Sequence, residues 1–514
     1  MHSLIKVANK FKLVFLSALL IQPQMVLALP VSQLALAEMQ QKAEQGDLQA
    51  IDALARRYRD GRGVAVDMVR AVQWFRVSAT RGFAPSQAAL GRLMQIGTGI
   101  TKDENAGLRL IQLAAEQKVP DAYRYLGYAY EGGLGISKDF NRAQTEYRKA
   151  IPFLVQSAED GDATAQKTLG DMYSRGRGVI KSNEQAVLWY SKAAEQGDAD
   201  AQCNLGFCYE NGYGVIKSDE HALLWYRKAA EQGHAIAQSN LGMSYSNGRG
   251  VIRSDEQAVF WYRKAAEQGY PVAQFNLGNR YANGCGVIKS DEQAAFWYRK
   301  AAEQGYPRAQ FNLGISYANG SGVTKSEEQA AFWYRKAADQ GYASAQNNLG
   351  LSYTNGCGVI KSEEQAVFWY RKAAEQGNAA AQCNLARSYR FGQGLTKCDE
   401  QAVFWYRKAV EQGNATAQYD LGECFEYGMG VSEDQAKAVA FYRMAAEQGL
   451  GRAAERLGVH YSLGQGVPLD KVEAYMWFYI YGALGNRSYN RLLPFCAQGL
   501  SVKNVQNAES RAKK

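Results

Sequence analysis

The residues of this chain best suited to catalysis or metal binding are few and scattered. Its histidines are His2, His221, His234 and His460. Their spacing matches no zinc site, and no nucleophile elbow, phosphate-binding glycine loop or Ser/His/Asp arrangement can be placed. Acidic pairs such as Asp219-Glu220 recur at one place in a repeated segment, which favours helix capping over acid–base chemistry. We therefore expect no catalytic residues, no metal and no cofactor.

The thiols give an equally weak chemical signal. The eight cysteines are Cys203, Cys208, Cys285, Cys357, Cys383, Cys398, Cys424 and Cys496. Cys203 and Cys208 lie five positions apart on one predicted helix, which is poor geometry for a bridge. Cys285 and Cys357 occupy equivalent positions of segments that are not neighbours. We interpret the cysteines as replacements for Ser or Ala; a disulfide framework is not supported, although one or two bridges stay possible.

A repeated segment explains the distribution of nearly all other residues. The sequence DEHALLWYRKAAEQG at Asp219–Gly233 returns as DEQAVFWYRKAAEQG at Asp255–Gly269, and near copies continue to Gly413 with a spacing of 36 residues. Between Gly46 and Gly485 this frame defines twelve repeats, of which the third has 43 residues and the others 36. All nine tryptophans fall at one position of the frame. A fixed period of this length predicts a stack of similar structural units.

Each repeat contains the pattern of two helices. In the fifth repeat, Asp198–Asn211 carries one apolar stripe, and Gly212 suits the left-handed residue that ends a helix. Gly206, in mid-helix, indicates a close crossing without room for a Cβ. Ser218 or Asp219 then caps a second helix, after a loop in which Val215-Ile216 can fill the interface. We predict an all-α fold, an α/α right-handed superhelical solenoid of about twelve 36-residue helical hairpins.

Two halves of the repeat resemble a known family. The pattern A-Q-x-x-L-G-x-x-Y-x-x-G-x-G-V is present as Ala201–Val215, and A-x-x-W-Y-R-K-A-A-E-Q-G as Ala222–Gly233. These resemble the Sel1-like repeat (SLR) family, which is related to tetratricopeptide repeats, over about residues 38–485. The resemblance implies an adaptor that binds proteins; exported bacterial relatives are linked to envelope assembly or host interaction. A hydrolase activity of the β-lactamase type, proposed for some cysteine-rich relatives, is an unfavoured alternative.

The two ends differ from the repeats. Lys6, Lys10 and Lys12 precede the short apolar run 13–21, and Val26-Leu27-Ala28 fits a cleavage site, with Ala35-Leu36-Ala37 as a second candidate. We expect a signal peptide at 1–28, a capping segment at 29–45, the repeats at 46–485, and a capping helix and tail at 486–514. An uncleaved anchor is the alternative to export into the periplasm, onto the cell surface or into the medium. No later stretch predicts an integral membrane segment.

The third repeat carries an insertion, Ile151–Ser157. Seven residues are close to two helical turns, so a lengthened second helix would keep its facing, whereas Pro152 argues for a break or kink. Either arrangement would offset the stack after the third repeat.

The positions that differ between otherwise similar repeats indicate the binding surface. They share one face of the first helix and, by resemblance to tetratricopeptide repeats, point into the concave groove. The predicted groove residues are Arg56, Arg59, Arg92, Tyr128 and Lys167 at one end, among Asp52, Glu131 and Asp171; Phe207, Met243, Phe275, Phe311, Ile315 and Leu351 in the middle; and Arg387, Arg390, Tyr419, Glu423 and Glu426 at the other end. Exposed apolar residues usually mark interaction sites. A neighbouring Asn ladder, as in Asn312 and Asn384, fits packing better than peptide binding.

These features predict a non-enzymatic, exported scaffold whose partner is a protein of the envelope or host. The formal net charge is +9, but Lys and Arg alternate with Glu and Asp in each repeat, so no nucleic-acid partner is expected. A purely structural envelope scaffold is the main alternative.

Overall fold

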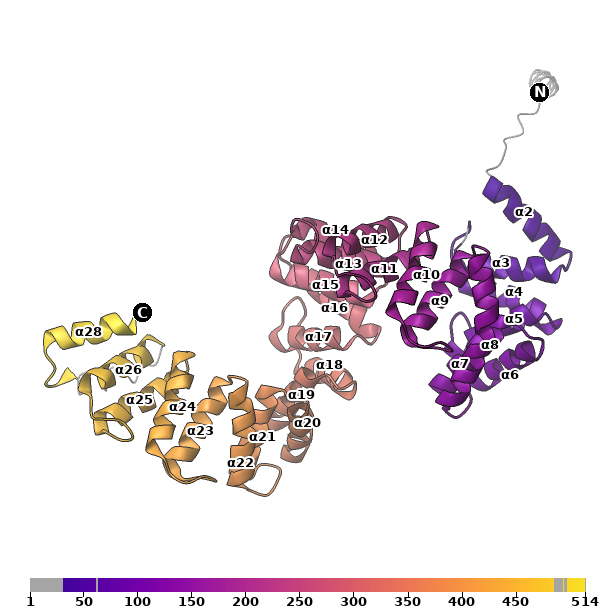
Figure 1. Ribbon diagram of the computed structural model, residues 1–514. Coiled ribbons are helices and arrows are strands. Elements are labelled where there is room, and N and C mark those ends of the chain that lie inside the picture. Colours follow the sequence, from indigo (N-terminus) through magenta and orange to yellow (C-terminus); the bar gives the residue numbers. More distant parts are fainter. Residues whose placement is uncertain (1–30, 62, 485–492, 494–496, 514) are drawn as a thin grey trace, which may run out of the picture. The chain divides into compact units, whose positions relative to one another are not determined.

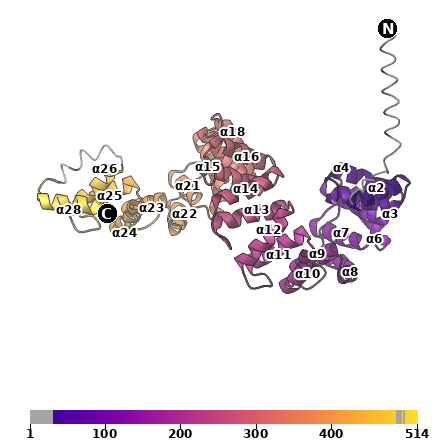
Figure 2. The same ribbon diagram turned by 90° about the horizontal axis from the view of Figure 1, so that it is seen from above.

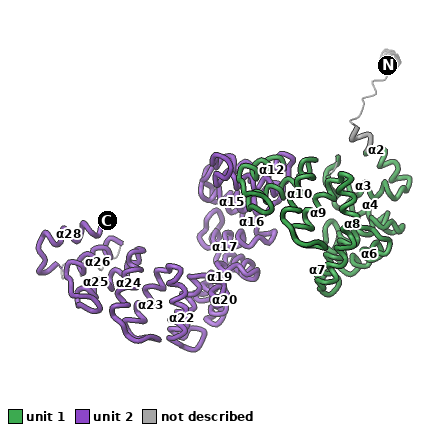
Figure 3. Tube along the Cα trace, viewed as in Figure 1, with its two compact units in different colours: residues 1–228 green, residues 229–514 purple. Residues whose placement is uncertain are grey.

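The computed structural model describes residues 31–61, 63–484, 493 and 497–513 (Figure 1). Over these residues the regular structure is helical throughout. The chain divides into two compact units, an N-terminal unit that ends at Lys228 and a C-terminal unit that begins at Ala229 (Figure 3). The predicted leader 1–28 lies outside the described residues.

The helices alternate between a first and a second helix of each repeat. The first helices are α3 (Leu48–Asp60), α5 (Ala84–Ile96), α7 (Pro120–Gly132), α9 (Ala163–Arg175), α11 (Ala199–Asn211), α13 (Ala235–Asn247), α15 (Pro271–Asn283), α17 (Pro307–Asn319), α19 (Ala343–Asn355), α21 (Ala379–Phe391), α23 (Ala415–Tyr427) and α25 (Gly451–Leu463). The second helices are α4 (Met68–Thr80), α6 (Glu104–Glu116), α8 (Phe140–Glu159), α10 (Asn183–Glu195), α12 (Asp219–Glu231), α14 (Asp255–Glu267), α16 (Asp291–Glu303), α18 (Glu327–Asp339), α20 (Glu363–Glu375), α22 (Asp399–Glu411), α24 (Gln435–Glu447) and α26 (Lys471–Ala483).

Within each unit, helices that follow one another in sequence also lie side by side in both views (Figures 1 and 2). Before the repeats stands α2 (Val31–Glu44), and after them α28 (Val502–Ala512). The last helix packs on α26, where Ala508 is fully buried and the Tyr475 hydroxyl donates to Glu509 at 3.2 Å. Within the segment 486–514, where a capping helix is predicted, α28 is therefore a helix that packs on the last repeat.

Helix ends are set by the residues that the sequence places there. Asp198 begins α11 by accepting a hydrogen bond from the backbone N–H of Ala201 at 2.8 Å, and Gly212 ends it with φ of 73°. Ser218 caps the next helix, because its hydroxyl accepts from the N–H of His221 at 3.2 Å. Ile216 is 91 % exposed, so the prediction that it fills the loop interface is wrong.

The core of each repeat joins the two helices closely. A Cβ built on Gly206 would lie 2.7 Å from the Tyr226 ring, which confirms the predicted close crossing. The tryptophans connect neighbouring repeats. Trp297 packs against the core formed by α14 and α15, and Trp333 against that of α16 and α17. Each tryptophan therefore closes the interface with the repeat that precedes it.

A ladder of glutamines adds polar contacts to these interfaces. The side-chain amide of Gln274 donates to the carbonyl of Ala266 at 3.1 Å, and Gln304 in turn donates to the side-chain oxygen of Gln274 at 2.8 Å. Gln274 is 4 % exposed. The pattern recurs in neighbouring repeats, as with Gln340 and Gln310. Because buried amides need partners, this ladder fixes the register of one repeat on the next.

The inserted residues lengthen α8 to 20 residues, against 13 in the other second helices. The helix runs through Pro152 without a break. The lengthened-helix alternative is thus the one that the structure adopts.

No helix in the part of the chain that the structure describes is long and apolar enough to cross a membrane.

Candidate partner-binding surface

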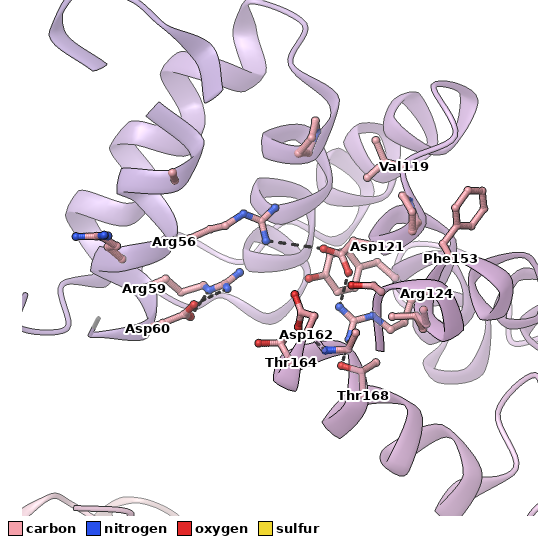
Figure 4. Close-up of a pocket in the computed structure, with 18 of the residues that line it drawn as sticks. Arg56, Arg59, Asp60, Val119, Asp121, Arg124, Phe153, Asp162, Thr164 and Thr168 are labelled. Carbon is pink, nitrogen blue, oxygen red and sulfur yellow. Dashed lines mark hydrogen bonds and ion pairs between the residues drawn. The ribbon is translucent and has the colours of Figure 1, made fainter. Parts of the chain in front are cut away.

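A cleft of about 880 Å³ opens on the predicted groove positions of the N-terminal unit (Figure 4). Its walls come from α3, from the first turns of α7 and α9, and from the inserted turns of α8. Arg56 and Arg59, both predicted as groove residues, lie on the α3 wall. Phe153, in the inserted turns of α8, lies across the cleft from Arg56 (Figure 4), and Leu154 also lines the cleft. A volume in this range is typical of a ligand-binding cavity.

One carboxylate connects two arginines across this cleft. Arg124 donates through Nη2 to Asp121 Oδ1 at 2.6 Å, while Arg56 Nη1 lies 3.8 Å from Asp121 Oδ2 (Figure 4). Burial, the largest influence, would lower the pKa of Arg124, but the charge and hydrogen bond of Asp121 together with Tyr125 and Tyr128 outweigh it and raise that pKa, so the guanidinium stays charged. The Nε of Arg124 is buried without a hydrogen-bond partner. Arg124 lies four residues before Tyr128 on the predicted face of α7 but was not among the predicted groove residues, and Asp121 lies outside that face.

The α3 arginines have their own acidic neighbours. Arg56 donates through Nε to Asp52 at 2.7 Å, and Asp52 also accepts from the hydroxyl of Ser86 at 2.8 Å. Arg59 binds Asp60 through Nε at 2.6 Å and through Nη2 at 2.9 Å. Asp52 is therefore a buried anchor that orients Arg56, whereas the Nη groups of Arg56 face the cleft.

The remaining predicted residues of this end form contacts between repeats. Arg92 lies over the Tyr128 ring at 5.1 Å, and Arg177 reaches the same ring at 4.9 Å while pairing with Glu131 at 2.9 Å. Lys167 lies 3.3 Å from Asp171 on its own helix α9 and 3.5 Å from Asp200 on α11 of the next repeat. Each of these charges is at least partly satisfied within the protein. Arg177 lies in a loop outside the predicted face and was missed.

The predicted apolar residues are unequally accessible. Phe207 is 49 % exposed and Leu351 37 % exposed. Phe275 packs edge-on against Tyr306 with ring centroids 5.4 Å apart, and Phe311 makes the same contact with Tyr342 at 5.3 Å. Met243 and Ile315 are half-buried. The phenylalanines thus both support the next repeat and leave part of a ring at the surface.

Small cavities occur between successive repeats of the C-terminal unit. Three of them have volumes of about 160, 230 and 190 Å³, and each is lined by a second-helix tyrosine and a ladder asparagine. The tyrosine–asparagine pairs are Tyr262 with Asn276, Tyr298 with Asn312, and Tyr370 with Asn384. Asn312 donates to Asn279 at 3.3 Å and Asn384 to Asn347 at 3.0 Å. These contacts favour packing between repeats as the role of the ladder.

At the C-terminal end the predicted charges form a connected network. Arg387 donates through Nε to Asp420 at 2.7 Å, and Arg390 through Nη1 to Glu423 at 2.8 Å. Tyr419 donates its hydroxyl to Glu423 at 2.9 Å and is 8 % exposed, so little of its side chain reaches the surface.

The network continues into the last repeat. Arg456 lies 3.6 Å from Glu426, and the Tyr442 hydroxyl donates to the same carboxylate at 2.5 Å. Burial would raise the pKa of Glu426, but the His460 ring nitrogen at 3.7 Å, the hydrogen bond from Tyr442 and the charge of Arg456 hold it at about 2. Asp420 and Arg456 lie outside the predicted positions.

Stacked two-helix hairpins with variable first-helix surfaces define an α-solenoid of the tetratricopeptide-like class. The chain belongs to the Sel1 repeat family, which matches residues 48–83, 84–119, 120–151, 163–198, 199–234, 235–270, 271–306, 307–342, 343–378, 379–414, 415–450 and 451–486. The third match ends at 151, where the insertion begins. The twelve predicted repeats are thereby confirmed.

Solved structures of two SLR proteins are similar to this chain. One is a protective antigen of uropathogenic Escherichia coli with an SLR fold, 35 % identical over 93 % of both chains with a TM-score of 0.65. The other is a Sel1 repeat protein from Oxalobacter formigenes, 33 % identical over 61 % of this chain and 94 % of that one, with a TM-score of 0.48. No curated protein matches the chain.

Proposed function

We propose that this protein is a non-catalytic scaffold that binds a segment of a protein partner along the concave surface of its repeats. Sel1 repeat proteins generally mediate protein–protein interaction, and this chain consists of such repeats over most of its length. The observation that carries the proposal is the cleft of about 880 Å³ at Arg56 and Arg59, where a cavity coincides with positions that vary between repeats. Phe207 and Leu351 add exposed apolar surface on equivalent helix faces.

The partner is, in this proposal, a protein of the cell envelope or of a host. The Lys-rich start and the apolar run 13–21 support export. The similar Escherichia coli protein is described as a protective antigen, which is consistent with a place accessible to a host. A structural envelope scaffold without a dedicated ligand is the competing proposal, and partner capture separates the two.

Affinity capture from envelope and host extracts tests the proposal. The unaltered chain is compared with a groove variant, Phe275→Ser with Phe311→Ser, and with a matched control, Phe296→Ser with Phe332→Ser. The control phenylalanines lie on second helices and are 44 % and 47 % exposed. A partner that is lost with the groove variant and kept with the control supports the proposal, provided that the helical circular dichroism is unchanged. Capture that survives every concave change contradicts it.

A further inference from the structure

The insertion in α8 moves the next repeat along the helix by two turns. In the regular helix α10, Gly170 of the same repeat meets Tyr190, whereas Gly214 of the next repeat meets Asn183, seven residues earlier. In α8 both contacts fall on one residue: Gly127 of the same repeat meets the Tyr147 ring, and Gly178 of the next repeat meets the Tyr147 backbone. The fourth repeat is therefore seated seven residues further along α8, which is about 10 Å at the helical rise.

The insertion that shifts the fourth repeat along α8 also forms the apolar wall of the cleft. The inserted residues Phe153, Leu154 and Ser157 all line it. Leu154 is held in the core between α8 and α9, whereas Phe153 is 48 % exposed. In the repeats with a 13-residue second helix there is no counterpart of these two turns. The cleft is thus a local product of the insertion, and a large exposed aromatic ring beside charged groups is typical of a binding site.

The opposite wall supplies hydrogen-bond donors for a carboxylate. The Nε of Arg56 is occupied by Asp52, which leaves its Nη groups facing the cleft, where Asp121 at 3.8 Å is beyond hydrogen-bond distance. Arg59 follows one turn later on α3, and Arg57 also lines the cleft. A planar guanidinium binds carboxylates through its Nη groups, and a ligand carboxylate would compete with Asp121 for the Nη1 of Arg56. The orientation of Arg56 is fixed by buried Asp52, so little entropy is lost when a ligand binds.

We propose that this cleft binds an internal peptide segment of the partner that carries an acidic side chain next to a large apolar one. The carboxylate would pair with Arg56 and the apolar side chain would pack on Phe153. Arg56, Arg57 and Arg59 lie within one turn of α3, and Phe153 lines the same cleft from α8, so two different side chains of one segment can contact the two walls, which a lone chain terminus would not do. This inference rests on the proposed function and specifies the chemistry of its partner.

The test uses the whole chain and fluorescence anisotropy with a defined peptide pool. In the pool one glutamate is flanked by phenylalanine or leucine, and both peptide ends are blocked, so that the side-chain carboxylate is the only one present. A second pool has glutamine in place of glutamate, and a third lacks glutamate but has a free carboxyl terminus. We expect the glutamate pool to bind at least about tenfold more tightly than the other two.

Variants then assign the binding to the cleft. Arg56→Gln keeps an amide that can reach Asp52 but removes the charge, and it should weaken binding about tenfold or more. Phe153→Ser should weaken peptide binding severalfold. This substitution is preferred to deleting residues 151–157, because the deletion could change how the helices pack. The control, Arg253→Gln, changes an arginine in the C-terminal unit that is 65 % exposed, and should bind like the unaltered chain. Circular dichroism checks that each variant is folded.

Three results would overturn the inference: no binding of the glutamate pool, equal binding of the glutamine or free-terminus pool, or unchanged affinity in both Arg56→Gln and Phe153→Ser. The proposed function fails separately. If the peptides do not bind but a partner is lost with the Phe275 and Phe311 changes, the scaffold stands and only the cleft is refuted. If the same partners are captured by every variant of the concave surface, the proposed scaffold function is contradicted instead.

Discussion

Arg387 of α21 donates through Nε to Asp420 of α23 at 2.7 Å, joining two repeats through a pair whose acidic member has a side chain only 4 % exposed. The sequence predicts Arg387 as one of the partner-binding residues at one end of the groove. The charge of Arg387 instead compensates the buried carboxylate of Asp420. Most other repeats have a neutral asparagine at this position, as with Asn384 in the preceding repeat. The pair is therefore part of the architecture at least as much as it is part of any surface offered to a partner.

Removing one member of this pair should cost stability. We expect Arg387→Ala to lower the free energy of unfolding of the C-terminal unit by about 2 kcal/mol, because it leaves the buried carboxylate of Asp420 with two weak contacts, Arg452 at 3.9 Å and the Cys383 thiol at 3.9 Å. Urea unfolding monitored by circular dichroism measures the loss. Combining Arg387→Ala with Asp420→Asn, which restores the residue of other repeats, should recover most of it. If the double variant loses as much free energy of unfolding as the two single variants lose together, the two residues are not coupled.

The last two repeats should lose stability in acid through Glu426. The pKa of this carboxyl is held at about 2 in the folded chain, below its ordinary value of 4.5, so its contribution is complete above pH 4.5 and is lost as the pH falls from there toward 2. The difference corresponds to about 3 kcal/mol for a side chain that is 11 % exposed. Thermal melting at a series of pH values should show a flatter profile for Glu426→Gln. Glu267→Gln, an exposed change on α14, should keep the original profile.

A structural feature of this protein can be predicted from the sequence when all the residues that form it lie within one repeat. The helix pairs, the close crossing at Gly206 and the tryptophan interfaces follow from residues within the 36-residue period, because every repeat presents them again. The cleft does not, since it joins α3 with α7, α8 and α9 and depends on a two-turn change of register. Likewise the partner of Arg387 lies in the next repeat. A loop position such as Ile216 was misjudged because an apolar residue after a turn need not be buried.

Thiol reactivity should separate the cysteines into two groups. Burial raises the pKa of Cys383 to about 12, and the charge of Asp420 adds to it; burial likewise raises the pKa of Cys424 to about 12. Cys285 and Cys357 are only partly buried. Because the thiolate is the reactive form, a brief treatment of the native chain with iodoacetamide at pH 8 should modify the second pair and spare the first. Peptide mass spectrometry reads the pattern, and denaturant should make all four react. Early modification of Cys383 would contradict its placement in the core.

The mid-helix glycines should resist replacement even by the best helix former. A Cβ on Gly278 would lie 2.6 Å from the Tyr298 ring, so Gly278→Ala must displace a core side chain. Alanine would otherwise gain about 1 kcal/mol in a helix, and we expect overpacking to reverse this into a net loss of about 1–2 kcal/mol. The equivalent residue of the tenth repeat is Ala386, which is fully buried in the same core cluster as Tyr406.

Ala386 supplies the matched control, because there the reverse change can be made. Ala386→Gly should also destabilise, by about 1 kcal/mol, since it removes a buried methyl group and lowers helix propensity. Urea midpoints of the two variants measure both effects. If Gly278→Ala is stabilising, the ring of Tyr298 can move aside at little cost, and the glycine is not required for the close crossing of the two helices. Destabilisation by both opposite changes would show that each repeat has its own fitted packing at this point.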